Sequence, residues 1–129
     1  MAGIVLAPEF LAIFNVGDSR VYALQANTLE MISVDHVAPT DRRTLERFIG
    51  GDGLHSLPAV RNIQFDPGTR ILLCTDGLYD VVDDDRIKEL LGQSDTVFAA
   101  RCLIAACLER GAPDNVSVAI CDFIAGRTI

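Results

Sequence analysis

Short apolar runs, separated by polar or turn-forming residues, dominate the first third of the chain. Residues 3–7 and 10–16 are two such runs, interrupted by a Pro-Glu pair, and this pattern is typical of two strands joined by a turn. Two further runs follow at residues 20–24 and 29–32. Together the four runs predict a meander of short, mainly antiparallel strands.

The middle of the chain predicts one helix and one hairpin. From residue 39 to residue 50, apolar residues recur at helical spacing and charged residues cover the other face, which predicts an amphipathic helix. Its apolar positions are Leu45, Phe48 and Ile49. Runs at 59–65 and 70–75 flank Asp66-Pro67-Gly68-Thr69, whose Pro and Gly suit a tight turn. These two runs are expected to pair as a second hairpin.

Two helices are predicted in the last third. Asp83 can cap the first, whose inward residues are Ile87, Leu90 and Leu91, and Gly92 can end it. Ser94 or Asp95 can cap the second, which ends before Gly111. The apolar stripe expected for this second helix is Val97, Ala100, Ile104, Cys107 and Leu108.

A closing strand is predicted at residues 116–121, where apolar residues alternate with smaller ones. The order of elements is then strands, helix, hairpin, two helices and strand. This order predicts an α+β fold with a largely antiparallel sheet, not alternating βαβ units. With 129 residues, of which 50% are hydrophobic and 22% charged, a single domain over residues 1–129 is expected.

Charge and cysteine content narrow the functional classes. The net charge is −7 and the basic residues form no stripe, which argues against nucleic acid and anionic membranes as partners. The cysteines lie in apolar stretches without zinc-ligand spacing, so reduced core residues and a cytoplasmic location are expected. They are Cys74, Cys102, Cys107 and Cys121. The apolar start contains Pro8 and has no basic region before it, so neither a signal peptide nor a membrane span is expected.

Three acidic motifs lie at expected strand ends, at residues 15–20, 75–80 and 111–115. Each joins an aspartate to a residue that permits a tight turn. If the strands are neighbours, the carboxylates meet at one edge, and oxygen-only ligands of this kind suit magnesium or manganese. Two such ions can turn a water into a nucleophile, so no side-chain nucleophile is required. Each motif alone is more typical of an ordinary turn than of a metal site, and His36 and His55 are expected to have a structural or surface role.

Residues 14–22, 35–36, 48–51, 72–82 and 114–118 form five motifs in a fixed order. In that order they resemble the metal-dependent protein serine/threonine phosphatases of type 2C (PPM), in their compact bacterial form. The resemblance implies a β-sandwich of two mainly antiparallel sheets flanked by helices. It also implies a binuclear manganese or magnesium centre and hydrolysis of phosphoserine and phosphothreonine in signalling proteins by a metal-activated water.

The same resemblance assigns residues to the site. Asp76 and Asp114 match two carboxylates that bind the metals, and Asp18 matches an acid associated with a further, weaker metal position. Asp80 matches an acid that contacts the metals or their waters. The supporting positions are Gly77, Asn115 and Arg20.

The chain also departs from the family pattern. Family members carry a Glu-Asp pair or an Asp near the amino terminus and an Asp-Gly-x-Gly-Gly motif, and neither occurs in residues 1–17. The chain therefore resembles the carboxy-terminal half of the domain, without the amino-terminal strands. We expect it to be inactive or nearly so by itself, and to form a homodimer or swapped assembly that covers the sheet edge at residues 3–16.

Two other functional classes remain open on the sequence. One is a pseudophosphatase or regulatory module that keeps the fold and an incomplete metal site but only binds a protein partner. The other is a divalent-cation-binding domain without hydrolytic activity. The acids of the first half of the domain discriminate between enzyme and regulatory module, because a full-length protein that has them can complete the metal shell.

Overall fold

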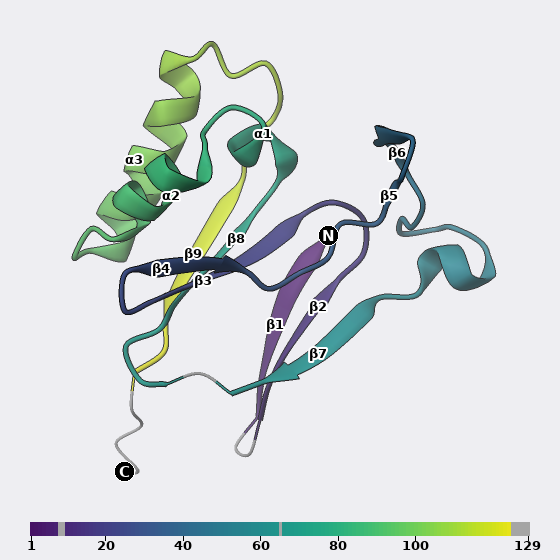
Figure 1. The fold of residues 1–129 in the computed structure, drawn as a ribbon, viewed down its shortest axis with the longest axis horizontal. Helices are drawn as coiled ribbons and strands as arrows, with labels where there is room; N and C mark the ends of the chain where they lie inside the picture. The colour runs from purple at the N-terminus through teal and green to yellow at the C-terminus, as the bar shows by residue number, and fades with distance from the viewer. Residues whose placement is uncertain (8–9, 65, 125–129) are drawn as a thin grey trace.

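Two antiparallel sheets form the body of the protein (Figure 1). The structure is a computed structural model that describes residues 1–7, 10–64 and 66–124. The first sheet has the strand order β1 (Ala2–Ala7), β2 (Phe10–Asn15), β7 (Ala59–Ile63). The second has the order β4 (Thr28–Met31), β3 (Arg20–Gln25), β8 (Arg70–Cys74), β9 (Val118–Asp122). Every pair within them is antiparallel.

The second sheet is buried on both faces, because the residues of β8 alternate between two cores. Ile71 packs with Ile13 and Val21 in the core that faces the first sheet. Leu72 and Cys74 pack in the other core, which includes the residues of the helices. The result is an α+β sandwich flanked by helices, as the sequence predicts.

Three helices cover the outer face of the second sheet: α1 (Asp76–Tyr79), α2 (Asp84–Leu91) and α3 (Thr96–Glu109) (Figure 1). The expected cap at Asp83 is present, since its carboxylate accepts a hydrogen bond from the Arg86 amide at 2.9 Å. Of the two candidates for the next cap, the structure uses Asp95, which accepts from the Phe98 amide at 2.7 Å. None of the helices in the described ranges is both long and apolar enough to cross a bilayer.

The apolar stripe expected for α3 is correct at Cys107 but wrong at both of its ends. The helix buries Ala99, Leu103, Ala106 and Cys107, whereas Val97 and Leu108 are 58% and 62% exposed. Nearly every position of α3 is apolar, so hydrophobic periodicity does not single out one face. The buried face contains two alanines, which allow the helix to approach the sheet closely.

The helix expected at residues 39–50 is absent. In its place β5 (Val37–Ala38) and β6 (Asp41–Leu45) pair as a hairpin, and a 3-10 turn, η1, follows at Gly53–Ser56. The Asp41 carboxylate accepts bonds from the Arg43 amide and the Thr44 hydroxyl, a local arrangement that competes with helix formation. The expected apolar stripe also has no core to pack against. Its residues are exposed: Leu45, Phe48 and Ile49.

The hairpin expected for residues 59–75 is also wrong, although its turn forms. The Thr69 amide donates to the Asp66 carbonyl at 3.1 Å, and Gly68 has a φ of 94°. However, β7 pairs with β2 while β8 pairs with β3 and β9. The turn therefore carries the chain from one sheet to the other.

The cysteines are all free, and three of the four match the expectation of core residues. Cys74 and Cys107 are buried and Cys102 is half-buried. Cys121 is exposed, in contrast to the expectation, because it lies on β9 at the edge of the second sheet.

Candidate metal centre

The loop between β2 and β3 presents Asp18 at one end of the sandwich. Gly17 makes the turn possible, since its φ of 91° is unfavourable for residues with a side chain. Buried His36 holds this turn from behind: its Nδ1 accepts from the Gly17 amide at 3.2 Å, and its own amide donates to the Gly17 carbonyl at 3.0 Å. This explains the structural role expected for His36. Exposed His55 lies away from this loop and its Nδ1 contacts the Glu46 carbonyl oxygen.

Asp76 lies at the same end, where β8 leads into α1. Asp76 is the first residue of the helix, and its carboxylate accepts a hydrogen bond from the Gly77 amide at 3.0 Å. Thr75, at the N-cap position, makes no capping bond with its side chain. Its hydroxyl instead donates to the Asn115 carbonyl at 3.3 Å and accepts from the Ser117 amide at 3.0 Å. The Asp76 segment is thereby tied to the segment that carries Asp114.

Gly77 permits this close approach. A Cβ at this position would clash with the carbonyl oxygen of Asn115 and stand 2.9 Å from its carbonyl carbon. The glycine expected to have a supporting role therefore supports the site through its lack of a side chain. Asn115 contributes its backbone, and its amide also donates to the Asp114 carboxylate at 2.6 Å.

The pKa of Asp76 shows which other carboxylates lie close to it. The pKa of Asp76 is raised above its ordinary value, first by burial and then by the negative charge of Asp18. The Gly77 amide opposes this rise, and the charge of Asp114 adds to it. The charges of Asp18 and Asp114 therefore both act on Asp76 at this end of the fold, and a bound cation would relieve that repulsion.

Asp80 is exposed, as Asp114 is, and it follows α1, where its amide donates to the Asp76 carbonyl at 3.0 Å. The charges that raise the Asp76 pKa come from Asp18 and Asp114. The metal contact implied for Asp80 stays a prediction.

Arg20 lies beside the acids but is paired elsewhere. Its guanidinium donates to Asp35 through Nε at 3.1 Å and Nη2 at 2.7 Å, and through Nη1 to the Tyr22 hydroxyl at 2.9 Å. Burial lowers the pKa of Arg20, but these hydrogen bonds outweigh burial and the net shift is upward. Arg42 of β6 shares Asp35 at 3.0 Å. Arg20 is thus a fixed cation, and the supporting role implied for it stays a prediction.

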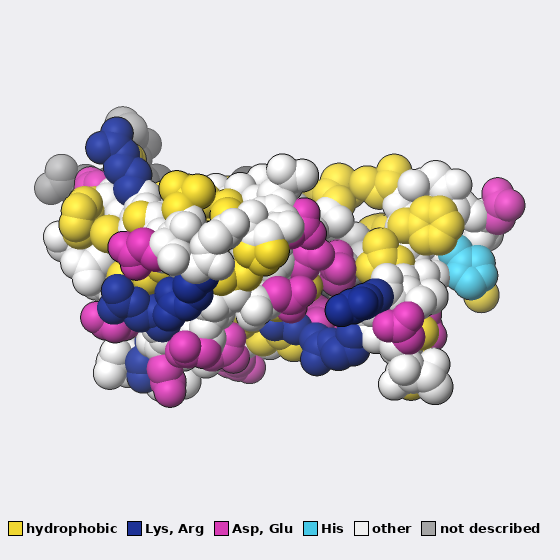
Figure 2. Space-filling view, turned by 90° about the horizontal axis from the view of Figure 1, so that it is seen from above, with side chains coloured by type: hydrophobic (Ala, Val, Ile, Leu, Met, Phe, Trp, Pro, Cys, Tyr) yellow, Lys and Arg dark blue, Asp and Glu magenta, His cyan; other side chains and the backbone are white. Residues whose placement is uncertain are grey.

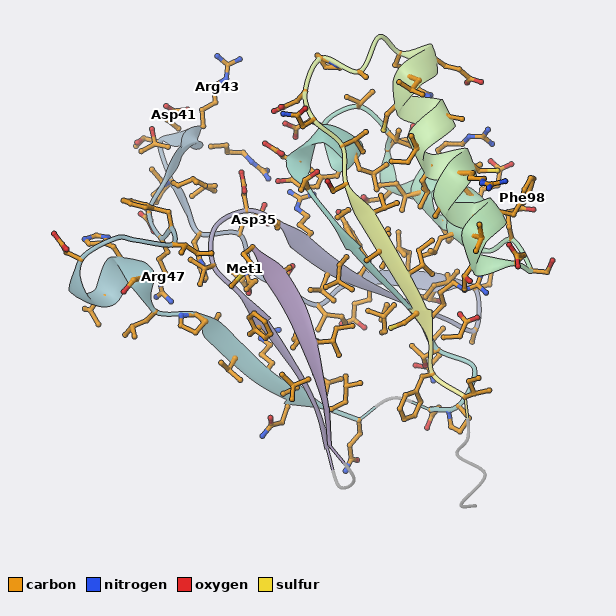
Figure 3. The ribbon with its side chains drawn as sticks, turned by 180° about the vertical axis from the view of Figure 1, so that it is seen from behind. Met1, Asp35, Asp41, Arg43, Arg47 and Phe98 are labelled. Atoms are coloured by element: carbon orange, nitrogen blue, oxygen red, sulfur yellow. The ribbon has the colours of Figure 1, made fainter. Side chains whose placement is uncertain are left out.

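Figure 2 shows acidic side chains gathered on the middle of the face seen from above, with basic side chains beside them. Figure 3 shows Asp35 between Met1, at the start of β1, and the β6 residues Asp41 and Arg43. The β5–β6 hairpin therefore projects next to the acidic end of the sandwich.

The donor set fits part of a shell for a hard cation. Its donors are carboxylate oxygens, which suit Mg²⁺ and Mn²⁺. In the part of the chain that the structure describes, however, no three acidic, His or Cys side chains lie close enough together to hold a metal ion.

Sequence reasoning missed one residue of this region, Tyr79. It lies on α1, and its hydroxyl donates to the Asp18 carbonyl at 2.9 Å. No local signal identifies it, because its partner is 61 positions away in the sequence.

Comparison with known proteins gives a consistent picture, although no family model matches the chain. The serine/threonine protein phosphatase PstP of Mycobacterium tuberculosis is 33% identical over 141 residues, which cover 96% of this chain and 27% of PstP. The crystal structure of the PstP catalytic domain with two manganese ions has a TM-score of 0.80 at 31% identity, over 95% of this chain and 57% of that one.

A second solved structure, PppA of Pseudomonas aeruginosa, has a TM-score of 0.83 at 30% identity, over 91% of this chain and 53% of that one. The chain thus spans about a quarter of PstP and about half of the solved domains. PstP is thus similar to this chain both in sequence and in fold. The chain therefore resembles the carboxy-terminal half of the domain found in metal-dependent serine/threonine phosphatases of type 2C (PPM).

Proposed function

We propose that the complete domain, of which this chain resembles one half, hydrolyses phosphoserine and phosphothreonine in phosphoproteins with the help of Mn²⁺ or Mg²⁺. The observation that carries the proposal is that Asp18, Asp76 and Asp114 gather at one end of the sandwich, where the Asp114 segment is bonded to Thr75 and where burial first, and then the charges of Asp18 and Asp114, raise the pKa of Asp76. Relatives named as serine/threonine phosphatases support the assignment. Bound metal ions would clamp the phosphoryl oxygens and activate a water for attack.

The residues of this chain would divide the work as follows. Asp76 and Asp114 would provide metal-binding carboxylates, Asp18 a carboxylate for a weaker metal position, and Asp80 a contact to the metals or their waters. Three other residues keep these acids in place: Gly77, Asn115 and Arg20.

The 129 residues by themselves are proposed to be inactive. Support comes from the described ranges, in which no group of three donor side chains could hold a metal ion. The same observation favours a second candidate function, a pseudophosphatase or regulatory module that binds a protein partner. A complete shell contributed by the first half of the domain would favour the enzyme.

Hydrolysis of a phosphothreonine peptide with Mn²⁺ tests these proposals. The assay compares this chain with a chain extended by the first half of a relative's domain, each with and without chelator. Asp76→Asn removes the central carboxylate, and Asp85→Asn is the matched control, because Asp85 is an exposed acid in the first turn of α2. We expect no turnover by the short chain, and turnover by the extended chain that chelator and Asp76→Asn abolish and Asp85→Asn preserves.

Other outcomes separate the alternatives. Turnover by the short chain, lost with chelator and with Asp76→Asn, would refute its inactivity and keep the phosphatase assignment. Silence from both chains would favour the regulatory module.

We also propose that the chain associates through the open edge of the sandwich, as a homodimer or swapped assembly, and that it resides in the cytoplasm. The strands β1 and β9 end their sheets, and both lie on the side that faces the viewer in Figure 3. Between them is a hollow of about 280 Å³ lined by Ala2, Leu73 and Ala119 among others. Four free cysteines, one of them exposed, support a reducing compartment.

A further inference from the structure

Tyr79 contacts both Asp18 and Arg20. It lies at the end of α1, the short helix that begins with Asp76. Its hydroxyl donates to the Asp18 carbonyl oxygen at 2.9 Å. The guanidinium carbon of Arg20 lies 3.5 Å from the centre of its ring. One side chain therefore joins the helix of Asp76 to the loop of Asp18.

The Arg20 guanidinium, which lies over the Tyr79 ring, is held rigidly. The Arg20 side chain is 13% exposed and Asp35 is 10% exposed. Two guanidinium nitrogens donate to the Asp35 carboxylate and a third to the Tyr22 hydroxyl. A guanidinium held at several points on an aromatic face loses little further freedom on stacking. The ring of Tyr79 is thus fixed, and its hydroxyl can act as a fixed donor.

Strands β3 and β8 place Arg20 opposite Cys74, so the loop of Asp18 and the Asp76 segment lie at the same end of neighbouring strands. The loop itself is held through Val16 to Met1 and through Gly17 to His36, and the Tyr79 hydroxyl adds a direct hydrogen bond from α1 to Asp18. The Asp114 segment is joined to the Asp76 segment by the Thr75 hydroxyl and by packing on Gly77. Without the Tyr79 hydroxyl, Asp18 would lose a direct hydrogen bond to the α1 side of the site.

We propose that Tyr79 is a positioning residue for the metal site, whose hydroxyl sets the position of Asp18 relative to Asp76 and Asp114. The proposal rests on the proposed function, because it assigns a role within the same site. Tyr79 acts through the Asp18 backbone and not on a metal or a substrate. Arg20 in turn acts through the ring of Tyr79.

The test compares two variants that each lose one phenolic hydroxyl from the Arg20 network. Tyr79→Phe keeps the ring on Arg20 but removes the bond to Asp18. Tyr22→Phe is the matched control, because the Tyr22 hydroxyl accepts from Arg20 and bonds to Asp84 but does not contact Asp18. Both variants and the unmodified chain are labelled with ¹⁵N and titrated with substoichiometric Mn²⁺, a paramagnetic ion that broadens the amide signals close to it.

In the unmodified chain and in Tyr22→Phe, we expect Mn²⁺ to broaden the amides of Ser19, Gly77 and Asn115 together. In Tyr79→Phe, Gly77 and Asn115 should still broaden, but the effect at Ser19 should fall by roughly three- to tenfold, which is the usual effect of one lost hydrogen bond on an equilibrium. Urea unfolding of both variants measures the general loss of stability, which should be similar.

The outcomes separate this inference from the proposed function. Broadening in the unmodified chain that Tyr79→Phe leaves unchanged at Ser19 would overturn the positioning role while preserving the metal site. An equal loss at Ser19, Gly77 and Asn115 in Tyr79→Phe would also overturn it, because the effect would then be general. Absence of broadening in all three proteins would show that these residues do not gather a cation in this chain; that would overturn this inference and leave the proposal for the complete domain to the turnover assay.

Discussion

Gly77 lies against the peptide group of Asn115, so that a Cβ on Gly77 would stand 2.9 Å from the Asn115 carbonyl carbon and closer still to its oxygen. The Asn115 atoms at this contact are its backbone carbonyl carbon and oxygen, which cannot move aside as a flexible side chain can. The contact holds the start of α1 against the segment before β9. The spacing of Asp76 and Asp114 therefore depends on a residue that has no side chain.

Gly77→Ala should destabilise the chain, because the added methyl group requires one backbone segment to shift. We expect a loss of about 2–3 kcal/mol in the free energy of unfolding, which is at the upper end for overpacking. Gly92→Ala is the control, since Gly92 has a φ of −71° and its Cβ would approach the Lys88 carbonyl oxygen at 3.3 Å. Urea unfolding of both variants checks this. Equal stability of Gly77→Ala and the unmodified chain would show that the contact is looser than the structure has it.

Asp76→Asn should stabilise the metal-free chain at neutral pH. The pKa of Asp76 is raised by burial and by Asp18, so the folded state binds its proton more tightly than the unfolded state. The protonated Asp76 carboxyl therefore stabilises the fold below its ordinary pKa of 3.8. This stabilisation is lost as the pH rises through the higher pKa of the folded state. The gain from Asp76→Asn should stay below about 1 kcal/mol, because water screens this half-buried group.

Asp122→Asn provides a control of opposite sign. A hydrogen bond from Arg70 lowers the pKa of Asp122 in the folded state. The ionised Asp122 carboxylate therefore stabilises the fold above its ordinary pKa, and this stabilisation is lost as the pH falls through the lower pKa of the folded state. Thermal unfolding is measured between pH 3 and 7 in the presence of chelator. At pH 7 the melting temperature of Asp76→Asn should therefore be higher than that of the unmodified chain, and the melting temperature of Asp122→Asn should be lower. A destabilised Asp76→Asn without metal would contradict the repulsion of Asp76 by Asp18 and Asp114.

Asp35→Asn should be far more costly than removal of a surface ion pair. Arg20 and Asp35 are 13% and 10% exposed, so the change leaves a buried guanidinium without its charged partner, at a cost of about 3 kcal/mol. Arg86 and Glu89 are 40% and 63% exposed, and Glu89→Gln should cost less than about 1 kcal/mol. Urea unfolding of the two variants side by side measures the difference. Similar losses would mean that Asp35 does not hold Arg20 in solution.

Local signals in the sequence predicted most elements of the fold. The caps Asp83 and Asp95 identified the starts of α2 and α3, because a side-chain cap acts within one turn. Pairing between distant strands has no local signal. The turn at residues 66–69 was correct, but β7 pairs with β2 instead of β8. Segment 39–50 had helical periodicity without a buried face to support it, and periodicity without a packing partner does not make a helix.

The sequence pointed to the acids of the candidate site but not to the contacts around them. The motifs gave Asp18, Asp76 and Asp114 as candidate metal ligands, which stays a prediction, and in the structure the charges of Asp18 and Asp114 both act on Asp76. The steric reason for Gly77 depends on the approach of Asn115, which follows from the fold and not from the motif. Tyr79 had no signal, since its hydrogen bond to Asp18 joins two loops that are distant in sequence.

Val5→Lys should weaken the proposed association of two copies. Val5 is 47% exposed on β1, an edge strand whose range Ala2–Ala7 contains no charged residue, and edges without charge favour pairing with another strand. A lysine on each copy would bring like charges together, and we expect a weakening of roughly tenfold or more, equivalent to about 1.4 kcal/mol. Val60→Lys is the matched control, because Val60 is 62% exposed on β7, the opposite edge of the same sheet. Light scattering over a concentration series measures all three proteins; a monomer at every concentration, or equal effects of both lysines, would exclude association through β1.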